Sequence, residues 1–181
     1  MTAKEIQKVI KNQNNKILEV VRGEVDEMSM LLVPQFQGAE LLCAKYVSDF
    51  AIDGYRFIRS KFISEIISDE KNETLSFYNR VYAKENLGSY PNCKYNCDTF
   101  RKLFEELAKS GDAVTVECNF EEAIDYYVGK VTDLTGNLAT MQCFDGSGVL
   151  FKDKIRVNLD FVSMVSLGDR YTSTMAKYIN W

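Results

Sequence analysis

The most informative part of this sequence is Phe62-Ile63-Ser64-Glu65-Ile66, because a close variant occurs again as Phe161-Val162-Ser163-Met164-Val165. A second pair of similar blocks precedes these in the same order, GEVDEM at residues 23–28 and GKVTDL at residues 129–134. Similar blocks in a fixed order indicate a duplicated structural unit. In a chain of 181 residues, the duplication favours two small units in which the first residues of each block occupy matching positions.

Short runs of β-branched and aromatic residues, separated by turn residues, predict two sets of strands. The first set lies within residues 17–67, where Asp53-Gly54 predicts a tight hairpin turn, and the second lies within residues 113–167. A capping box at Thr2-Ala3-Lys4-Glu5 predicts a helix at the start of the chain. Three further helices are predicted over residues 72–88, Phe100–Lys109 and Asp169–Tyr178.

Each set of about five short strands resembles an SH3-like or Sm-like barrel. The resemblance lies in the Gly-x-Val block, the turn-separated central strands and the final Phe-(Ile/Val)-Ser-x-(Ile/Val) strand. Closure into a barrel would also remove exposed edges. We therefore predict an α+β, predominantly β protein of two small SH3-like or Sm-like antiparallel β-barrels, each followed by a helix, with an N-terminal helix and a linker helix. The predicted units are residues 1–88, the linker and helix 89–112, and residues 113–181.

The stretch from Tyr127 to Tyr171 also resembles a family of uncharacterised bacterial proteins, a likeness that implies no activity. Hydrophobic residues make up 46% of the chain, but the apolar runs are far shorter than the ~20 residues that span a bilayer. The N-terminus lacks the pattern of a secretory signal. The sequence therefore predicts a cytoplasmic protein with no membrane association.

The chain contains no histidine, which is the commonest general base and imidazole metal ligand in proteins. No phosphate-binding loop and no other familiar catalytic motif is present. We therefore predict a protein that is not an enzyme, with no catalytic residues and no cofactor. The alternative is an enzyme that uses carboxylates in a cleft between the two units.

Five cysteines form an odd set without paired spacing: Cys43, Cys93, Cys97, Cys118 and Cys143. A chain without an export signal normally keeps such thiols reduced. The spacing of Cys93 and Cys97 suggests a metal, but a structural zinc site needs four ligands and a cysteine-only site would need distant cysteines to converge. The sequence therefore favours small buried or partly buried thiols and predicts no metal site.

The densest acidic cluster contains Glu117, Glu121, Glu122 and Asp125. Clustered carboxylates can bind Ca²⁺ or Mg²⁺, but no calcium-loop pattern fixes their geometry here. A solvated acidic hairpin is the favoured interpretation, and cation binding by the cluster is left open.

Aromatic and basic residues in two strands are the candidates for a binding surface: Tyr55, Arg56, Phe57, Arg59, Tyr126 and Tyr127. Strand alternation sends Arg56 to the face opposite its three neighbours, so the first group can share a platform only in part. The net charge of −4 also opposes nucleic-acid binding. The predicted function is a binding or scaffold module for an unknown protein partner, with an RNA-associated regulator as the alternative. The oligomeric state and the ligand are left open.

Overall fold

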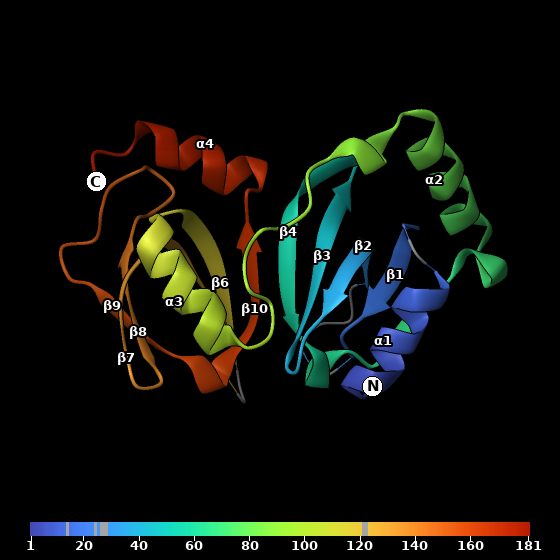
Figure 1. Cartoon of the computed structure of the whole chain (residues 1–181). Coiled ribbons are helices and arrows are strands. Elements are labelled where there is room, and N and C mark those ends of the chain that lie inside the picture. The colour runs from blue at the N-terminus through green and yellow to red at the C-terminus, as the bar shows by residue number, and fades with distance from the viewer. Residues whose placement is uncertain (14, 24, 26–28, 121–122) are drawn as a thin grey trace.

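Ten strands form one antiparallel sheet in the order β5-β1-β2-β3-β4-β10-β6-β7-β8-β9 (Figure 1). This computed structural model describes residues 1–13, 15–23, 25, 29–120 and 123–181. The strands of the first half are β1 (Leu18–Val21), β2 (Ser29–Gln37), β3 (Leu41–Ser48), β4 (Ala51–Arg59) and β5 (Glu65–Ile67). Those of the second half are β6 (Ala113–Asn119), β7 (Ile124–Thr135), β8 (Leu138–Cys143), β9 (Ile155–Asn158) and β10 (Val162–Leu167).

Four α-helices lie in the described residues: α1 (Ala3–Asn12), α2 (Glu73–Lys84), α3 (Phe100–Ser110) and α4 (Arg170–Tyr178). Four 3-10 turns accompany them: η1 (Ser60–Phe62), η2 (Asp69–Lys71), η3 (Leu87–Ser89) and η4 (Leu159–Phe161). The predicted capping box is present, because Thr2 accepts the backbone N–H of Glu5 and the Glu5 carboxylate accepts that of Thr2. None of the helices within the described residues has the length and apolar character needed to cross a membrane.

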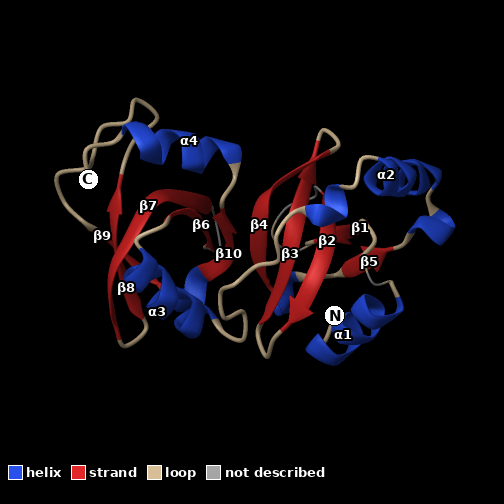
Figure 2. Cartoon of the chain, turned by 45° about the horizontal axis from the view of Figure 1, so that its top comes forward, coloured by secondary structure: helices blue, strands red, loops and turns tan. Residues whose placement is uncertain are grey.

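The prediction of two closed barrels is wrong, because both halves belong to one open sheet (Figure 2). Each half has four strands, a 3-10 turn and a fifth strand that pairs with the first. The two halves join where β4, through residues 55–58, pairs with residues 164–167 of β10. This pairing satisfies the backbone groups of two strands that would otherwise be edges, so the sheet continues across the molecule.

The repeated sequence blocks occupy matching positions only in part. Phe62 and Phe161 each end the 3-10 turn that precedes the fifth strand. Gly23 follows β1, however, whereas Gly129 lies inside β7. Residues 24 and 26–28 of the first block lie outside the described residues.

The predicted turn at Asp53-Gly54 is also wrong. Asp49 and Phe50, with φ values of 47° and 61°, form the turn between β3 and β4. Gly54 lies within β4 at φ 76°, and a Cβ atom there would be 2.4 Å from the carbonyl oxygen of Leu167. Gly54 is therefore required by the close approach of β10 and by its own left-handed backbone.

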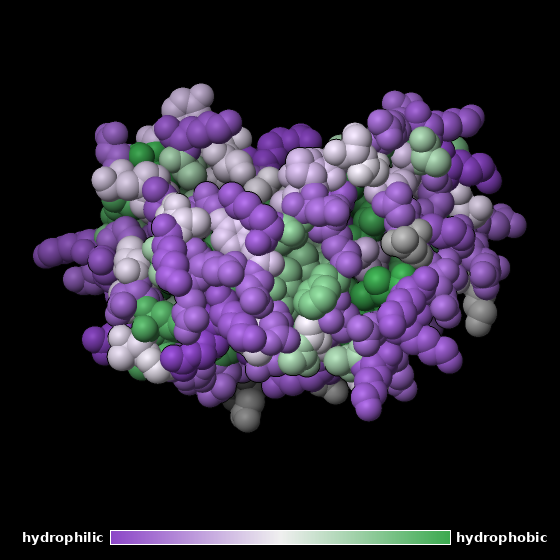
Figure 3. Space-filling view, in the orientation of Figure 1, coloured by the Kyte–Doolittle hydropathy of each residue, from purple (hydrophilic) through white to green (hydrophobic). Residues whose placement is uncertain are grey.

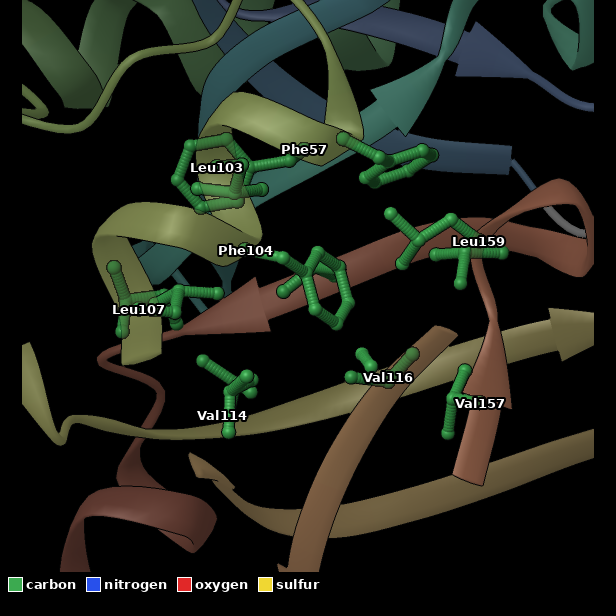
Figure 4. Close-up of a cluster of buried hydrophobic side chains, with 14 of the residues drawn as sticks. Phe57, Leu103, Phe104, Leu107, Val114, Val116, Val157 and Leu159 are labelled. Atoms are coloured by element: carbon green, nitrogen blue, oxygen red, sulfur yellow. The ribbon is translucent and has the colours of Figure 1, made fainter. Parts of the chain in front are cut away.

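One face of the sheet, called the front face here, carries a row of direct cross-strand neighbours on six strands: Phe36, Cys43, Phe57, Val165, Val116 and Tyr127. Direct cross-strand neighbours point to the same side. Helix α3 covers the second half of this face with four buried side chains: Phe100, Leu103, Phe104 and Leu107. Figure 4 shows Phe57 of the first half beside these α3 residues, so the core on the front face is shared by both halves.

The opposite face of the first half is covered by α1, whose Ile6 is fully buried against Leu32 and Ile58.

Behind the sheet, Arg22 and Glu117 form a buried ion pair with Nη1 and Oε1 2.6 Å apart, and the Ser163 hydroxyl also donates to this carboxylate. Arg22 directly follows β1 and Glu117 lies in β6, so the sheet curls enough to bring the two halves together at this point. Breaking such a buried pair typically costs about 3–5 kcal/mol.

Candidate metal centre

Three cysteine thiols meet on the front face. The Sγ atoms of Cys43, Cys93 and Cys97 all lie within 4.8 Å of one another. Cys43 comes from β3, whereas Cys93 and Cys97 come from residues 90–99, a segment without helix or strand that we call the strap. The prediction of buried or partly buried thiols is confirmed, because all five cysteines are free, four of them buried and Cys93 half-buried. The convergence of three of them was not predicted, and it arises because the strap lies over a strand that comes much earlier in the chain.

Two side chains of the front face hold the start of the strap. The Lys45 ammonium group in β3 donates to the carbonyl of Tyr90. The Tyr55 hydroxyl in β4 donates to the carbonyl of Pro91 at 2.7 Å. Burial raises the pKa of Tyr55 to about 12, so this hydroxyl keeps its donor proton at neutral pH. Burial also lowers the pKa of Lys45.

The rest of the strap is fixed by β2 and by the turn that follows it. The Gln35 side chain accepts the backbone N–H of Cys93 at 3.0 Å. A Cβ atom at Gly38 would lie only 2.3 Å from the carbonyl oxygen of Cys97, so this approach requires glycine. Side chains or turns of three neighbouring strands thus hold both strap cysteines over Cys43, and the positions of the three sulfurs are set by the fold.

The three thiols share their protons unequally. Hydrogen bonds from the Cys43 and Cys97 thiols lower the pKa of Cys93 to about 4, against the opposing effect of burial. The pKa of Cys43 is raised, mainly by its hydrogen bonds to Cys93 and Cys97 and to a lesser extent by burial. For Cys97 the hydrogen bond with Cys43 lowers the pKa, but donation to Cys93, burial and the Cys93 charge together raise it to about 12. One thiolate, on Cys93, is therefore present at neutral pH.

A pocket of about 520 Å³ opens beside the thiols. Its walls are Gln35, Phe36, Cys43, Asn92, Cys93, Tyr95, Asn96, Cys97, Asp98 and Lys102. Cys93 is half-buried and the other two cysteines are buried, so Cys93 is the thiol most open to the pocket. In Figure 3 a pale green, moderately apolar area lies in the middle of this side of the molecule, where β4 and the strap run in Figure 1.

The residues predicted as a binding surface in β4 have other roles. Phe57 is fully buried in the shared core. The Arg59 guanidinium donates to the carbonyls of Val162 and Leu159, at 2.8 and 2.6 Å. Arg56 lies 4.3 Å from the centre of the Tyr46 ring, and burial lowers its pKa. Tyr55 holds the strap, as described above, so these four side chains form no common platform.

The remaining predicted groups lie elsewhere in the second half. Tyr126 is 58% exposed, and its half-buried neighbour Tyr127 donates to Asp125 at 3.3 Å. Glu117 is 1% exposed and belongs to the buried ion pair, so it is no part of a solvated acidic hairpin. Glu121 and Glu122 lie outside the described residues.

Sequence reasoning missed Cys43 as a partner of the strap cysteines. The spacing of Cys93 and Cys97 indicated that these two thiols could lie close together. Nothing in the sequence near Cys43 indicates which segment covers its strand. No family model matches the chain, and neither a curated protein nor a solved structure matches it. Its function must therefore be argued from the chemistry of the site.

Proposed function

We propose that this protein binds a thiophilic metal ion, Zn²⁺ or Cu⁺, through Cys43, Cys93 and Cys97. The observation that carries the proposal is the convergence of three sulfur atoms from two separate segments. Thiolates are the ligands that such soft or borderline ions select. In the described part of the chain, the potential ligand atoms that cluster here are these three sulfurs.

The spacing of the sulfurs suits an ion at their centre. Zinc–sulfur bonds of about 2.3 Å in tetrahedral geometry place sulfur atoms about 3.8 Å apart. The three Sγ atoms already lie within 4.8 Å of one another, so a small contraction of the strap would complete the contacts. Because Cys43 lies in a strand paired on both sides, most of this movement would fall on the strap.

Proton chemistry also favours a cation. Cys93 is already a thiolate at neutral pH, because the other two thiols donate hydrogen bonds to it. The raised pKa values of Cys43 and Cys97 mean that their protons leave when a metal ion replaces them. Metal uptake at neutral pH should therefore release about two protons per ion.

A site with three protein ligands leaves a fourth zinc position for water or another small ligand. The carboxylate of Asp98, which also lines the pocket, accepts from Lys102 at 2.6 Å and from the backbone N–H of Ala39 at 2.9 Å. These two contacts engage the Asp98 carboxylate, so it is not assigned as the fourth ligand. The fourth ligand in this proposal enters through the pocket.

The proposal is tested by adding Zn²⁺ to the fully reduced protein and measuring bound zinc after gel filtration. We expect one ion per chain, and a loss of at least tenfold in affinity for Cys93→Ala in competition with a chromogenic chelator. Cys143→Ala is the control, because Cys143 is also a free cysteine but lies buried in the core of the second half. Equal zinc uptake by both variants would refute the site.

The protein-interaction function stays a prediction, as do its RNA-associated and enzymatic alternatives. Phe36, which is 52% exposed and lines the pocket, is an apolar contact that a protein partner could use. The internal contacts of Arg56 and Arg59 argue against the RNA alternative, because both guanidinium groups are already engaged within the protein.

A further inference from the structure

We propose that oxidation joins Cys93 and Cys97 in a disulfide and thereby releases the metal ion. The inference rests on the proposed function, and it adds a control over the same site. Its basis is the position of three thiols at one pocket, two of them on a segment without regular structure and one in a strand.

Cys93 is the sulfur that an oxidant meets first. It lines the pocket and is half-buried, whereas Cys43 is 1% and Cys97 is 5% exposed. The pocket of about 520 Å³ has ample room for hydrogen peroxide or a small disulfide. Oxidation of a thiolate by peroxide depends on access to the sulfur, and this geometry provides it.

The partner of Cys93 is decided by the backbone on each side. Cys43 lies in β3 between Phe36 of β2 and Phe57 of β4, so any shift of its backbone would break strand pairing on both sides. Cys97 lies on the strap, four residues after Cys93 and outside any strand. A disulfide needs Cβ atoms about 3.5–4.5 Å apart, and the strap can reach that geometry more easily than the strand.

The chemistry balances with hydrogen peroxide as the oxidant. The Cys93 thiolate attacks one peroxide oxygen, the O–O bond breaks, and the products are a sulfenic acid on Cys93 and hydroxide. The Cys97 thiolate then attacks the Cys93 sulfur, a sulfur–sulfur bond forms, and the sulfenic oxygen leaves as hydroxide, which takes a proton from the solvent. Two electrons pass from the two sulfurs to peroxide. Only the Cys43 thiolate then remains for the metal, and a single thiolate is too few ligands to hold zinc.

The experiment uses the full chain, reduced and loaded with zinc, then treated with hydrogen peroxide. Released zinc is read with a chromogenic chelator, and the bridge is mapped by mass spectrometry after tryptic digestion without reduction. Trypsin cuts after Lys94, between the two strap cysteines, so the bridge links the peptides Glu85–Lys94 and Tyr95–Arg101. We expect one such bridge per zinc ion released, and recovery of zinc binding after treatment with a dithiol.

Cys43→Ala separates the two steps. This variant has lost one metal ligand, but peroxide should still form the Cys93–Cys97 bridge in it, because both sulfurs of that bridge lie on the strap. A bridge from Cys93 to Cys43, or a Cys93–Cys97 bridge without zinc release, would overturn the inference while leaving the proposed function intact. Failure of the reduced protein to take up zinc would refute the proposed function and with it the release step.

Discussion

The strap and helix α3 are consecutive segments that cover neighbouring parts of the same sheet face in different ways. Helix α3 places Leu103, Phe104 and Leu107 against the second half and leaves them almost without exposure. The strap, residues 90–99, covers the first half with hydrogen bonds from Lys45 and Tyr55 to its carbonyls. Helix α3 thus seals a dry core, whereas the strap leaves a pocket with three thiols beside it.

The difference shows how one continuous core can carry both stability and a site. A regular helix satisfies its own backbone groups and can present an unbroken apolar side to the sheet. An irregular segment must satisfy its backbone groups through side chains, so polar residues enter the front face at Gln35, Lys45 and Tyr55. These contacts fix the strap without filling the space around Cys93.

The largest expected effect distinguishes the helix-covered core from the surface. Phe104 of α3 is fully buried against the sheet, so Phe104→Ala should cost about 3–5 kcal/mol of unfolding free energy. Phe161 is 44% exposed, although it stands in the repeated block, and Phe161→Ala should cost roughly 1 kcal/mol or less. Urea denaturation of both variants measures the difference. Equal losses would mean that α3 does not seal the core as described.

The next effect compares a strap cysteine with a core cysteine in the reduced, metal-free protein. Hydrogen bonds from Cys43 and Cys97 lower the pKa of Cys93 to about 4, whereas burial raises that of Cys143 to about 11. Only the thiolate reacts with iodoacetamide, so at pH 6 Cys93 should be alkylated about a hundredfold faster than Cys143. Because its charge persists as the pH falls toward 4, the Cys93 rate should be nearly flat between pH 6 and 8. A rate that climbs tenfold per pH unit over this range would contradict the shared-proton description.

A smaller effect tests whether close approach of the strap builds the site. Gly38→Ala would place a methyl group against the Cys97 carbonyl, so the strap must shift, at a typical cost of about 1–3 kcal/mol. Zinc affinity should fall about tenfold, as measured by competition with a chelator. Gly146→Ala is the matched control, because a Cβ atom there meets nothing within 4 Å. Unchanged affinity in Gly38→Ala would show that the strap position does not matter for the ion.

Local signals predicted the parts of this fold that depend on local physics. The predicted helix Phe100–Lys109 corresponds to α3, because Thr99 accepts the backbone N–H of Lys102 at the cap and Gly111 ends the helix in a left-handed conformation. The strand-rich composition likewise gave a predominantly β chain. These features arise from neighbours along the sequence.

The parts that could not be predicted depend on contacts between distant segments. Pairing of β4 with β10 joins residues 55–58 to residues 164–167, and no turn or spacing near either strand indicates it. The cluster of three thiols has the same origin. Cys93 and Cys97 are close in sequence, but their third partner, Cys43, lies in β3, which precedes α2 in the sequence.

X-ray absorption spectroscopy of the zinc-loaded, reduced protein tests the metal centre most directly, because it counts the sulfur ligands around the ion. Coordination by Cys43, Cys93 and Cys97 predicts three sulfur atoms at about 2.3 Å and one lighter atom completing the shell. The Cys43→Ala variant should lose one sulfur from that shell. A zinc shell made of oxygen or nitrogen alone, or one unchanged by Cys43→Ala, would contradict the assignment of this site.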